Sequence, residues 1–159
     1  MVEKAIRYNI KGKKYINTLA KYYFTDIGLR NAILAFRQME PTHIMENIIF
    51  NELLCRGYSV DVGVVELKTV DKNGKDIRKQ FEVDFVVNDS DQRYYIQSAY
   101  SIPDEAKMQQ ETASFRYTED SFKKVIVVKD DVPMYRTDSG YLIIGLLDFL
   151  LNPELLIKG

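Results

Sequence analysis

Two acidic residues and one amide lie in segments that otherwise carry many apolar residues, where a polar side chain indicates either a functional site or a structural hydrogen-bonding group. Glu46 lies in a segment of helical periodicity, Asp84 in a segment that alternates polar and apolar residues, and Gln97 in the next such segment. Oxygen atoms are the ligands that Mg²⁺ prefers, and bound Mg²⁺ can activate water against a phosphodiester. Side chains of these types could therefore take part in metal-assisted hydrolysis if the fold brings them together. The alternative for each is a structural polar group held by hydrogen bonds.

The segments that carry Asp84 and Gln97 are predicted to pair as a β-hairpin. Along 77–87 the residues alternate between an apolar and a polar face, namely Phe81, Val83, Phe85 and Val87 against Gln80, Glu82 and Asp84. A loop at 89–92 sets Phe85 opposite Ile96 and Asp84 opposite Gln97. The same register puts Glu82 opposite Ala99. We therefore expect Glu82, Asp84 and Gln97 to converge on the polar face.

The elements that must position these residues form a mixed order of helices and strands. From residue 42 the pattern predicts a helix at 43–56, strands at 60–70, 77–87 and 93–101, a helix at 103–117, strands at 124–128 and 141–144, and a closing helix at 146–151. Before it come a β-ribbon at 6–16, a short strand at 21–25 and a helix to Phe36 with Leu29 and Ile33 on its buried side. The order predicts an α/β fold with helices packed on a mixed sheet.

Five sequence segments resemble motifs of a known protein family. The segments Lys21-Tyr22-Tyr23-Phe24-Thr25-Asp26-Ile27-Gly28-Leu29-Arg30, Met45-Glu46-Asn47, Asn51-Glu52-Leu53-Leu54-Cys55-Arg56-Gly57-Tyr58, Glu82-Val83-Asp84-Phe85-Val86 and Tyr95-Ile96-Gln97-Ser98-Ala99-Tyr100-Ser101 follow in order. They resemble the C-terminal domain of unknown function of prokaryotic AAA-type P-loop ATPases. The helical Glu, the strand Asp and the Gln element also resemble the signature of the PD-(D/E)XK nuclease superfamily.

The resemblance implies a fold and a domain division. The fold is a restriction-endonuclease-like mixed sheet flanked by helices, with an α-β-β-β-α-β core, expected over residues 41–159. Residues 1–40 would be a basic β-ribbon and linker helix, a remnant of the winged helix that precedes this domain in the family.

The resemblance also shows where the chain departs from an active nuclease. Ala99 occupies the position where the family pattern has lysine, and a methyl group supplies no charge. We expect Glu46 and Asp84 to approach each other beside Gln97 in a pocket that no ammonium group enters. The chain would then be a degenerate, non-catalytic module with a regulatory or interaction role. The alternative is a Mg²⁺-dependent nuclease whose lysine has migrated, with Lys107 or Lys68 as candidates.

No phosphate-binding loop is present in the sequence. Neither Gly12-Lys13 nor Gly74-Lys75 is followed by Ser or Thr, as a P-loop requires. ATP is therefore expected only on a missing or separate N-terminal ATPase domain, which would be the main partner. This chain should bind no cofactor of its own, except Mg²⁺ at Glu46 and Asp84 in the nuclease alternative.

Charge supplies a third alternative. The 159 residues hold 22 Lys and Arg against 23 Asp and Glu, but residues 1–24 hold six basic residues and one acidic residue. Lys11, Lys13 and Lys14 in this ribbon could contact nucleic-acid phosphates. The single cysteine, Cys55, suits a reducing compartment. The start of the chain lacks an apolar signal segment and no run spans a bilayer, so we expect a cytoplasmic protein without a membrane partner.

Overall fold

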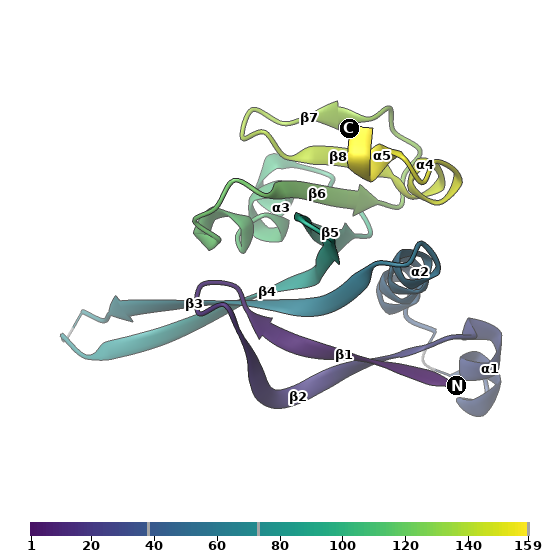
Figure 1. The fold of residues 1–159 in the computed structure, drawn as a ribbon, viewed down its shortest axis with the longest axis horizontal. Coiled ribbons are helices and arrows are strands. Elements are labelled where there is room, and N and C mark those ends of the chain that lie inside the picture. Colours follow the sequence, from purple (N-terminus) through teal and green to yellow (C-terminus); the bar gives the residue numbers. More distant parts are fainter. Residues whose placement is uncertain (38, 73, 159) are drawn as a thin grey trace.

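A computed structural model describes residues 1–37, 39–72 and 74–158. Its centre is one mixed eight-stranded sheet with the strand order β2-β1-β3-β4-β5-β6-β8-β7 (Figure 1). The strands are β1 (Val2–Asn9), β2 (Lys14–Phe24), β3 (Ser59–Val70), β4 (Asp76–Asp89), β5 (Gln92–Ala99), β6 (Lys123–Val128), β7 (Tyr135–Arg136) and β8 (Leu142–Gly145). The α/β class with a mixed sheet is therefore confirmed.

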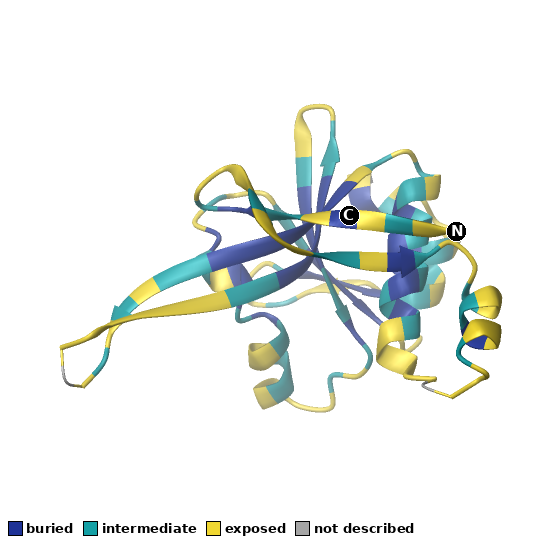
Figure 2. Cartoon of the chain, turned by 90° about the horizontal axis from the view of Figure 1, so that it is seen from below, coloured by how far each residue is buried: buried dark blue, intermediate teal, exposed yellow. Residues whose placement is uncertain are grey.

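Helices cover both faces of this sheet. They are α1 (Ile27–Ile33), α2 (Pro41–Cys55), α3 (Glu105–Glu111), the 3-10 turn η1 (Phe115–Tyr117), α4 (Leu146–Leu151) and α5 (Leu155–Lys158). One core cluster joins α2, α4 and α5 to the sheet through Phe50, Phe85 and Phe149. A second cluster on the opposite face packs Phe115, with the α3 side chain Met108 against it. The buried residues accordingly run through the middle of the molecule (Figure 2).

The N-terminal ribbon belongs to the same sheet as the rest of the chain. Strand β1 pairs with β2 in antiparallel fashion and with β3 in parallel, the latter over Arg7–Asn9 and Val62–Val64. Ala5 and Tyr23 lie in the core cluster that contains α2. The segments that the sequence separates at residue 40 thus share one sheet and one core.

The predicted register of the hairpin is confirmed over Phe85–Asp89, but its strict alternation is wrong. Phe85 faces Ile96 as expected, and the turn is tighter than predicted because Asp89 already pairs with Gln92. Between Asp61 and Gly63 of β3, however, β4 carries one extra residue. This bulge moves Val83 to the core cluster opposite that of Phe85.

Gly63 makes the bulge possible. A side chain there would bring its Cβ within 2.8 Å of Val83 and Val86 and within 2.9 Å of Ile10. Such approaches are too close for any side chain in a packed core. The absence of a Cβ at this one position therefore lets β3 and β4 pass the bulge that carries Asp84.

The linker helix differs from its prediction. Asp26 caps α1 by accepting the Leu29 N–H at 2.8 Å, as the sequence indicates. Leu29 and Ile33, predicted to be buried, are instead 47% and 64% exposed, because α1 lies at the periphery of the sheet (Figure 1). None of the helices that the structure describes has the length and apolar character needed to cross a bilayer.

Candidate functional site: a carboxylate cluster around Lys21

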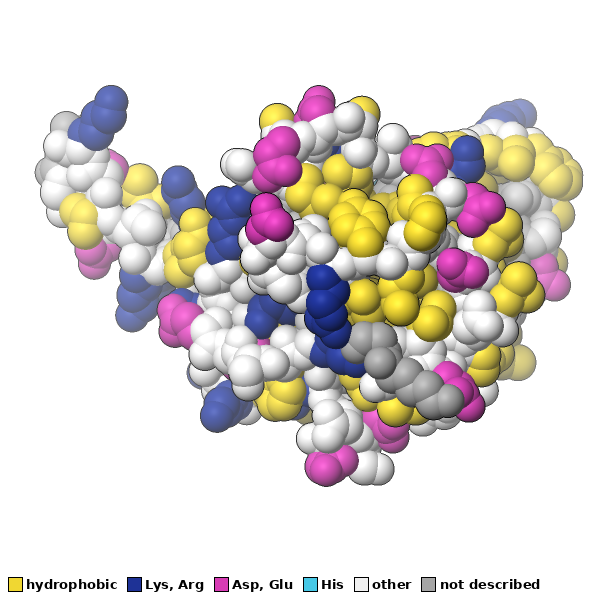
Figure 3. Space-filling view, turned by 90° about the horizontal axis from the view of Figure 1, so that it is seen from above, with side chains coloured by type: hydrophobic (Ala, Val, Ile, Leu, Met, Phe, Trp, Pro, Cys, Tyr) yellow, Lys and Arg dark blue, Asp and Glu magenta, His cyan; other side chains and the backbone are white. Residues whose placement is uncertain are grey.

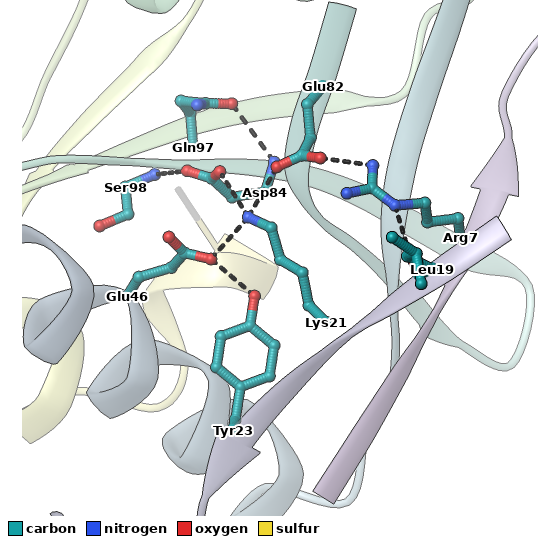
Figure 4. Close-up of polar contacts among 9 residues, drawn as sticks. All are labelled: Arg7, Leu19, Lys21, Tyr23, Glu46, Glu82, Asp84, Gln97 and Ser98. Carbon is teal, nitrogen blue, oxygen red and sulfur yellow. Dashed lines mark hydrogen bonds and ion pairs between the residues drawn. The ribbon is translucent and has the colours of Figure 1, made fainter. Parts of the chain in front are cut away.

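Three carboxylates from two elements converge on one ammonium group (Figure 4). Glu46 comes from α2, and Glu82 and Asp84 come from β4. The Lys21 Nζ lies 2.8 Å from Glu46 Oε1, 2.6 Å from Glu82 Oε1 and 3.7 Å from Asp84 Oδ1. We call Lys21, Glu46, Glu82 and Asp84 the carboxylate cluster. Its side chains are between 12% and 34% exposed, so their interactions are only partly screened by water.

The expectation that no ammonium group enters this pocket is wrong. The approach of Glu46 and Asp84 is as predicted, but Lys21 lies between them. Sequence reasoning misses Lys21 because it places the short strand at 21–25, like the ribbon, in an N-terminal segment (residues 1–40) separate from the domain that carries the carboxylates. The parallel pairing of β1 with β3 joins that ribbon to the sheet, and the Lys21 side chain then contacts Glu82 and Asp84 of β4. A cue was present, since Lys21 opens the longest of the motifs that carry the family resemblance.

An irregularity in the pairing of β2 with β1 sets the position of Lys21. Ala5 pairs with Lys21 and Arg7 pairs with Ile16, so residues 17–20 loop out of the ladder. Arg7 fixes this unpaired segment by donating its Nε–H to Leu19 O at 2.8 Å. The Nη1 of the same guanidinium pairs with Glu82 Oε2. Arg7 therefore joins the backbone before Lys21 to one of the carboxylates that Lys21 contacts.

Residues next to Lys21 fasten α2 to β2. The Tyr23 hydroxyl donates to Glu46 Oε1 at 2.6 Å, and its ring stacks on Phe50 with centroids 4.1 Å apart. Asn47 accepts the Phe24 N–H at 3.0 Å and donates its amide to Phe24 O at 2.8 Å. These bonds satisfy both the amide oxygen and the amide nitrogen of the buried Asn47 side chain with partners on β2. They fix the position of Glu46 relative to Lys21.

Asp84 is held by the neighbouring strand. Its Oδ2 accepts the Ser98 N–H at 2.8 Å, and its own N–H approaches Gln97 Oε1 at 3.4 Å. The predicted proximity of Asp84 and Gln97 is therefore confirmed. Gln97 uses its carbonyl oxygen on the backbone of Asp84, so its role in the structure is that of a strand-to-strand contact.

Burial and crowding of like charges alter the proton affinities in the cluster. Burial, followed by the charge of Glu46, raises the pKa of Asp84 to about 7, although Lys21 and the Ser98 N–H act in the opposite direction. Burial alone lowers the pKa of Lys21, but the Glu46 and Asp84 charges outweigh it and raise the pKa above its ordinary value. Lys21 therefore remains an ammonium group at neutral pH, where it cannot act as a base.

The electrostatics of Glu82 and Tyr23 agree with this arrangement. Burial opposes ionisation of Glu82, yet its bonds to Lys21 and Arg7 lower its pKa. Burial and the Glu46 charge raise the pKa of Tyr23, which keeps the phenol protonated as a donor. At neutral pH the cluster thus contains the Lys21 ammonium group, an ionised Glu82 and an Asp84 near its midpoint of titration.

The other lysines that the sequence offered lie elsewhere. Lys107 on α3 forms an ion pair with Glu111 at 2.5 Å, and Lys68 is exposed on β3. Ala99 is 2% exposed and packs in the apolar core cluster on the α3 side of the sheet, where a lysine would have no polar partner. Of the ribbon lysines, Lys11 pairs with Glu119, whereas Lys13 and Lys14 are exposed.

A cavity of about 340 Å³ opens beside the cluster. Its walls include Lys21 and Glu46, together with His43 and Asn47 of α2. Within the described ranges, no group of three or more His, Cys, Asp or Glu side chains is arranged to hold a metal ion. Glu46 and Asp84 are the two carboxylates that could hold one, provided Lys21 withdrew.

Comparison with known proteins adds one relative. The chain is 34% identical over 149 residues to an uncharacterized protein of Haemophilus influenzae. The match covers 94% of this chain but only 33% of the relative, so the chain spans about a third of the length of the protein it resembles. No protein-family model and no solved structure matches the chain.

Proposed function

We propose that this chain is a non-catalytic, nuclease-like module of a longer protein, in which Lys21 stands where an active nuclease would hold its metal ion. The observation that carries the proposal is the position of the Lys21 Nζ within 2.8 Å of both Glu46 and Glu82. A cluster neutralised in this way needs no metal ion to be stable.

The ammonium group and a metal ion compete for the same oxygens. Mg²⁺ binds oxygen ligands at about 2.0–2.1 Å in near-octahedral geometry. Lys21 already binds Glu46 Oε1 and approaches Asp84 Oδ1. An ion coordinated by both carboxylates would therefore have to displace Lys21, against the attraction of three acidic side chains.

The restriction-endonuclease-like fold and the link to an ATPase belong to the same proposal. The order α2, β3, β4, β5, α3, β6 follows the α-β-β-β-α-β core that the resemblance implies, with Glu46, Asp84 and Gln97 on the expected elements. A relative three times as long is consistent with a module attached to another domain. In this proposal that domain is the AAA-type ATPase that binds ATP, and the module serves regulation or interaction in the cytoplasm.

One observation favours a second candidate, a Mg²⁺-dependent nuclease with a migrated lysine. Lys21 supplies, from β2, the ammonium group that Ala99 cannot supply. In that case Glu46 and Asp84 would hold the ion, and Lys21 would neutralise charge that develops on the phosphate. The candidate requires Lys21 to leave Glu46 when the ion binds.

Titration calorimetry with Mn²⁺ separates the two candidates. The non-catalytic proposal predicts no binding to the wild type, a new site in Lys21→Met, and loss of that site in Lys21→Met/Asp84→Asn. Because Lys21→Met loses stability, its folding is verified by circular dichroism, and Mn²⁺ should raise its Tm but not that of the wild type.

Plasmid nicking in Mg²⁺ completes the test. The proposal predicts no nicking by the wild type. Mn²⁺ binding and nicking by the wild type, both abolished by Glu46→Gln and by Asp84→Asn, would overturn it in favour of the nuclease. Requiring the same loss in both variants guards against a contaminating nuclease.

A further inference from the structure

The outer parts of β3 and β4 form an arm that extends beyond the body of the molecule. Strand β1 pairs with β3 only over Val62–Val64, and β5 pairs with β4 only over Phe85–Asp89. Beyond these contacts β3 and β4 pair with each other alone, out to Val70 opposite Asp76. Figures 1 and 2 show this exposed two-stranded ribbon projecting from the sheet. We call residues 66–72 and 74–80 the arm.

Basic residues dominate the charge of the arm. It holds five of them against three acidic residues, the basic ones being Lys68, Lys72, Lys75, Arg78 and Lys79. All five are exposed. Figure 3 shows Lys and Arg side chains on the arm and where it joins the body. Lys13 and Lys14 follow the end of β1, where Ile10 bonds to Val64 near the base of the arm.

The acidic side chains of the arm are largely engaged, whereas the basic ones are not. Glu66 accepts a bond from Gln80 at 3.0 Å, and Asp71 accepts the Lys75 N–H at 2.8 Å in the turn. Among the described residues no carboxylate lies within ion-pair distance of the five basic side chains. Asp76, opposite Val70, is the third acidic residue. The positive charge of the arm is thus open to an external anion.

Two of these cations face each other directly. Lys68 pairs with Arg78 across the ladder, so both side chains leave the same face of the ribbon. Like charges in directly opposed positions destabilise a β-hairpin. Charged residues also protect exposed strand edges from aggregation. Because a pair of opposite charges would give the same protection without repulsion, protection alone does not explain two cations in opposed positions. The repulsion is relieved when a polyanion binds between the two side chains.

The shape of the arm selects among polyanions. The major groove of B-form DNA is wide enough for a two-stranded β-ribbon, whereas that of A-form RNA is too deep and narrow. A ribbon with cations on its face and around its tip can place them near phosphates on both walls of the groove.

We propose that the arm binds duplex DNA and that each of its five basic side chains contacts a phosphate, Lys68 and Arg78 from the face of the ribbon and Lys72, Lys75 and Lys79 from around it. This site differs from the ribbon lysines considered in the sequence. It does not depend on the role of the carboxylate cluster, since none of its residues belongs to that cluster.

Fluorescence anisotropy with a labelled random-sequence DNA duplex of about two helical turns tests the proposal on the full chain. Five phosphate contacts predict a slope of about −4.5 for log K against log salt, which is a loss of about 500-fold between about 50 and about 200 mM salt. Removing two contacts in Lys68→Gln/Arg78→Gln should reduce the slope by about 2. A duplex RNA of equal length should bind more weakly.

The matched control is Lys4→Gln/Arg37→Gln, which changes the net charge equally. Lys4 lies near the start of β1 and Arg37 follows α1 in the chain. Figure 1 shows the N-terminus and α1 at the end of the molecule away from the arm. This control should retain the wild-type slope. Absence of binding by the wild type at low salt, equal losses in the two double variants, or equal affinity for duplex RNA would each overturn the proposal.

Lys68→Glu provides a second test in which stability and binding move in opposite directions. It replaces the like-charge pair by an opposite-charge pair with Arg78, so its Tm should equal or exceed that of the wild type while its DNA affinity falls. If DNA affinity is unchanged in this folded variant, the proposal fails.

Discussion

The carboxylate cluster and the arm use charge in opposite ways. In the cluster each ionised side chain has a partner from another element, and Lys21 alone contacts three carboxylates. In the arm Lys68 and Arg78 face each other, and neither forms an ion pair with a carboxylate of the described residues. The two regions share strand β4, where Arg78 of the arm precedes Phe81, and Glu82 and Asp84 of the cluster follow it.

The difference separates charges that hold the fold together from charges left for a partner. Removing a group from a partly buried, mutually satisfied set leaves the others uncompensated. Removing an exposed, repelled group affects little besides the interaction with an external ligand. The stability of variants therefore distinguishes the regions.

The largest effect is expected for Lys21→Met. It leaves Glu46, Glu82 and Asp84 together without their shared cation, and the loss should be about 3–5 kcal/mol, as for one partner removed from a buried pair. Chemical unfolding at pH 7 measures it. Lys14→Met, an exposed change on the same strand, is the control. A loss as small as that of the control would contradict the assignment of Lys21 as the centre of the cluster.

Asp84→Asn should change the pH dependence of stability. With a pKa raised from 3.8 to about 7, folded Asp84 keeps a proton that the unfolded chain releases, so its contribution to stability falls as pH rises through this window. The slope attributable to it is about 1.4 kcal/mol per pH unit. Relative to wild type, the variant should therefore gain stability from pH 4 to 7.

Unfolding midpoints measured at several pH values check this prediction. Asp91→Asn removes an exposed carboxylate from the β4–β5 turn and should leave the slope as it is in the wild type. Parallel curves for wild type and Asp84→Asn would show that Asp84 titrates as an ordinary carboxyl group.

Tyr23→Phe tests one bond at the border of the cluster. The change keeps the ring stacked on Phe50 and removes the hydroxyl that donates to Glu46 at 2.6 Å. Loss of a hydrogen bond to a charged group should lower the free energy of unfolding by about 1.5 kcal/mol. Tyr22→Phe is the matched control, because Tyr22 is 64% exposed. Equal stabilities of the two variants would show that the bond from the Tyr23 hydroxyl to Glu46 does not stabilise the fold.

The smallest effect is expected in the arm. Lys68→Ala and Arg78→Ala should each change the free energy of unfolding by no more than about 0.5 kcal/mol, the usual range for exposed positions. Thermal unfolding followed by circular dichroism measures this. A loss above 1 kcal/mol in either variant would mean that the arm, like the cluster, is held by its own charges.

The sequence predicts much of the architecture because local patterns determine it. Alternation and turn chemistry give the pairing of Phe85 with Ile96, and with it the contact between Asp84 and Gln97. The strands predicted at 60–70, 77–87, 93–101 and 124–128 likewise follow from the residues of each segment and correspond to β3, β4, β5 and β6. These features depend on residues that are close in the chain.

Features that depend on distant pairing could not be predicted in the same way. The bulge near Gly63 depends on the backbone of a second strand, so alternation along β4 alone predicts the wrong face for Val83. Lys21 reaches Glu46 only because β1 pairs in parallel with β3, a contact across some fifty residues that no local pattern encodes. The exposed side of α1 likewise follows from its place outside the sheet.

The most direct test of the central claim is a crystal structure of the wild type soaked in Mn²⁺ and recorded at a wavelength where manganese scatters anomalously. We expect no anomalous peak between Glu46 and Asp84, and we expect the Lys21 Nζ to remain within hydrogen-bond distance of Glu46 and Glu82. A manganese peak that bridges Glu46 and Asp84, with Lys21 moved aside, would contradict that claim.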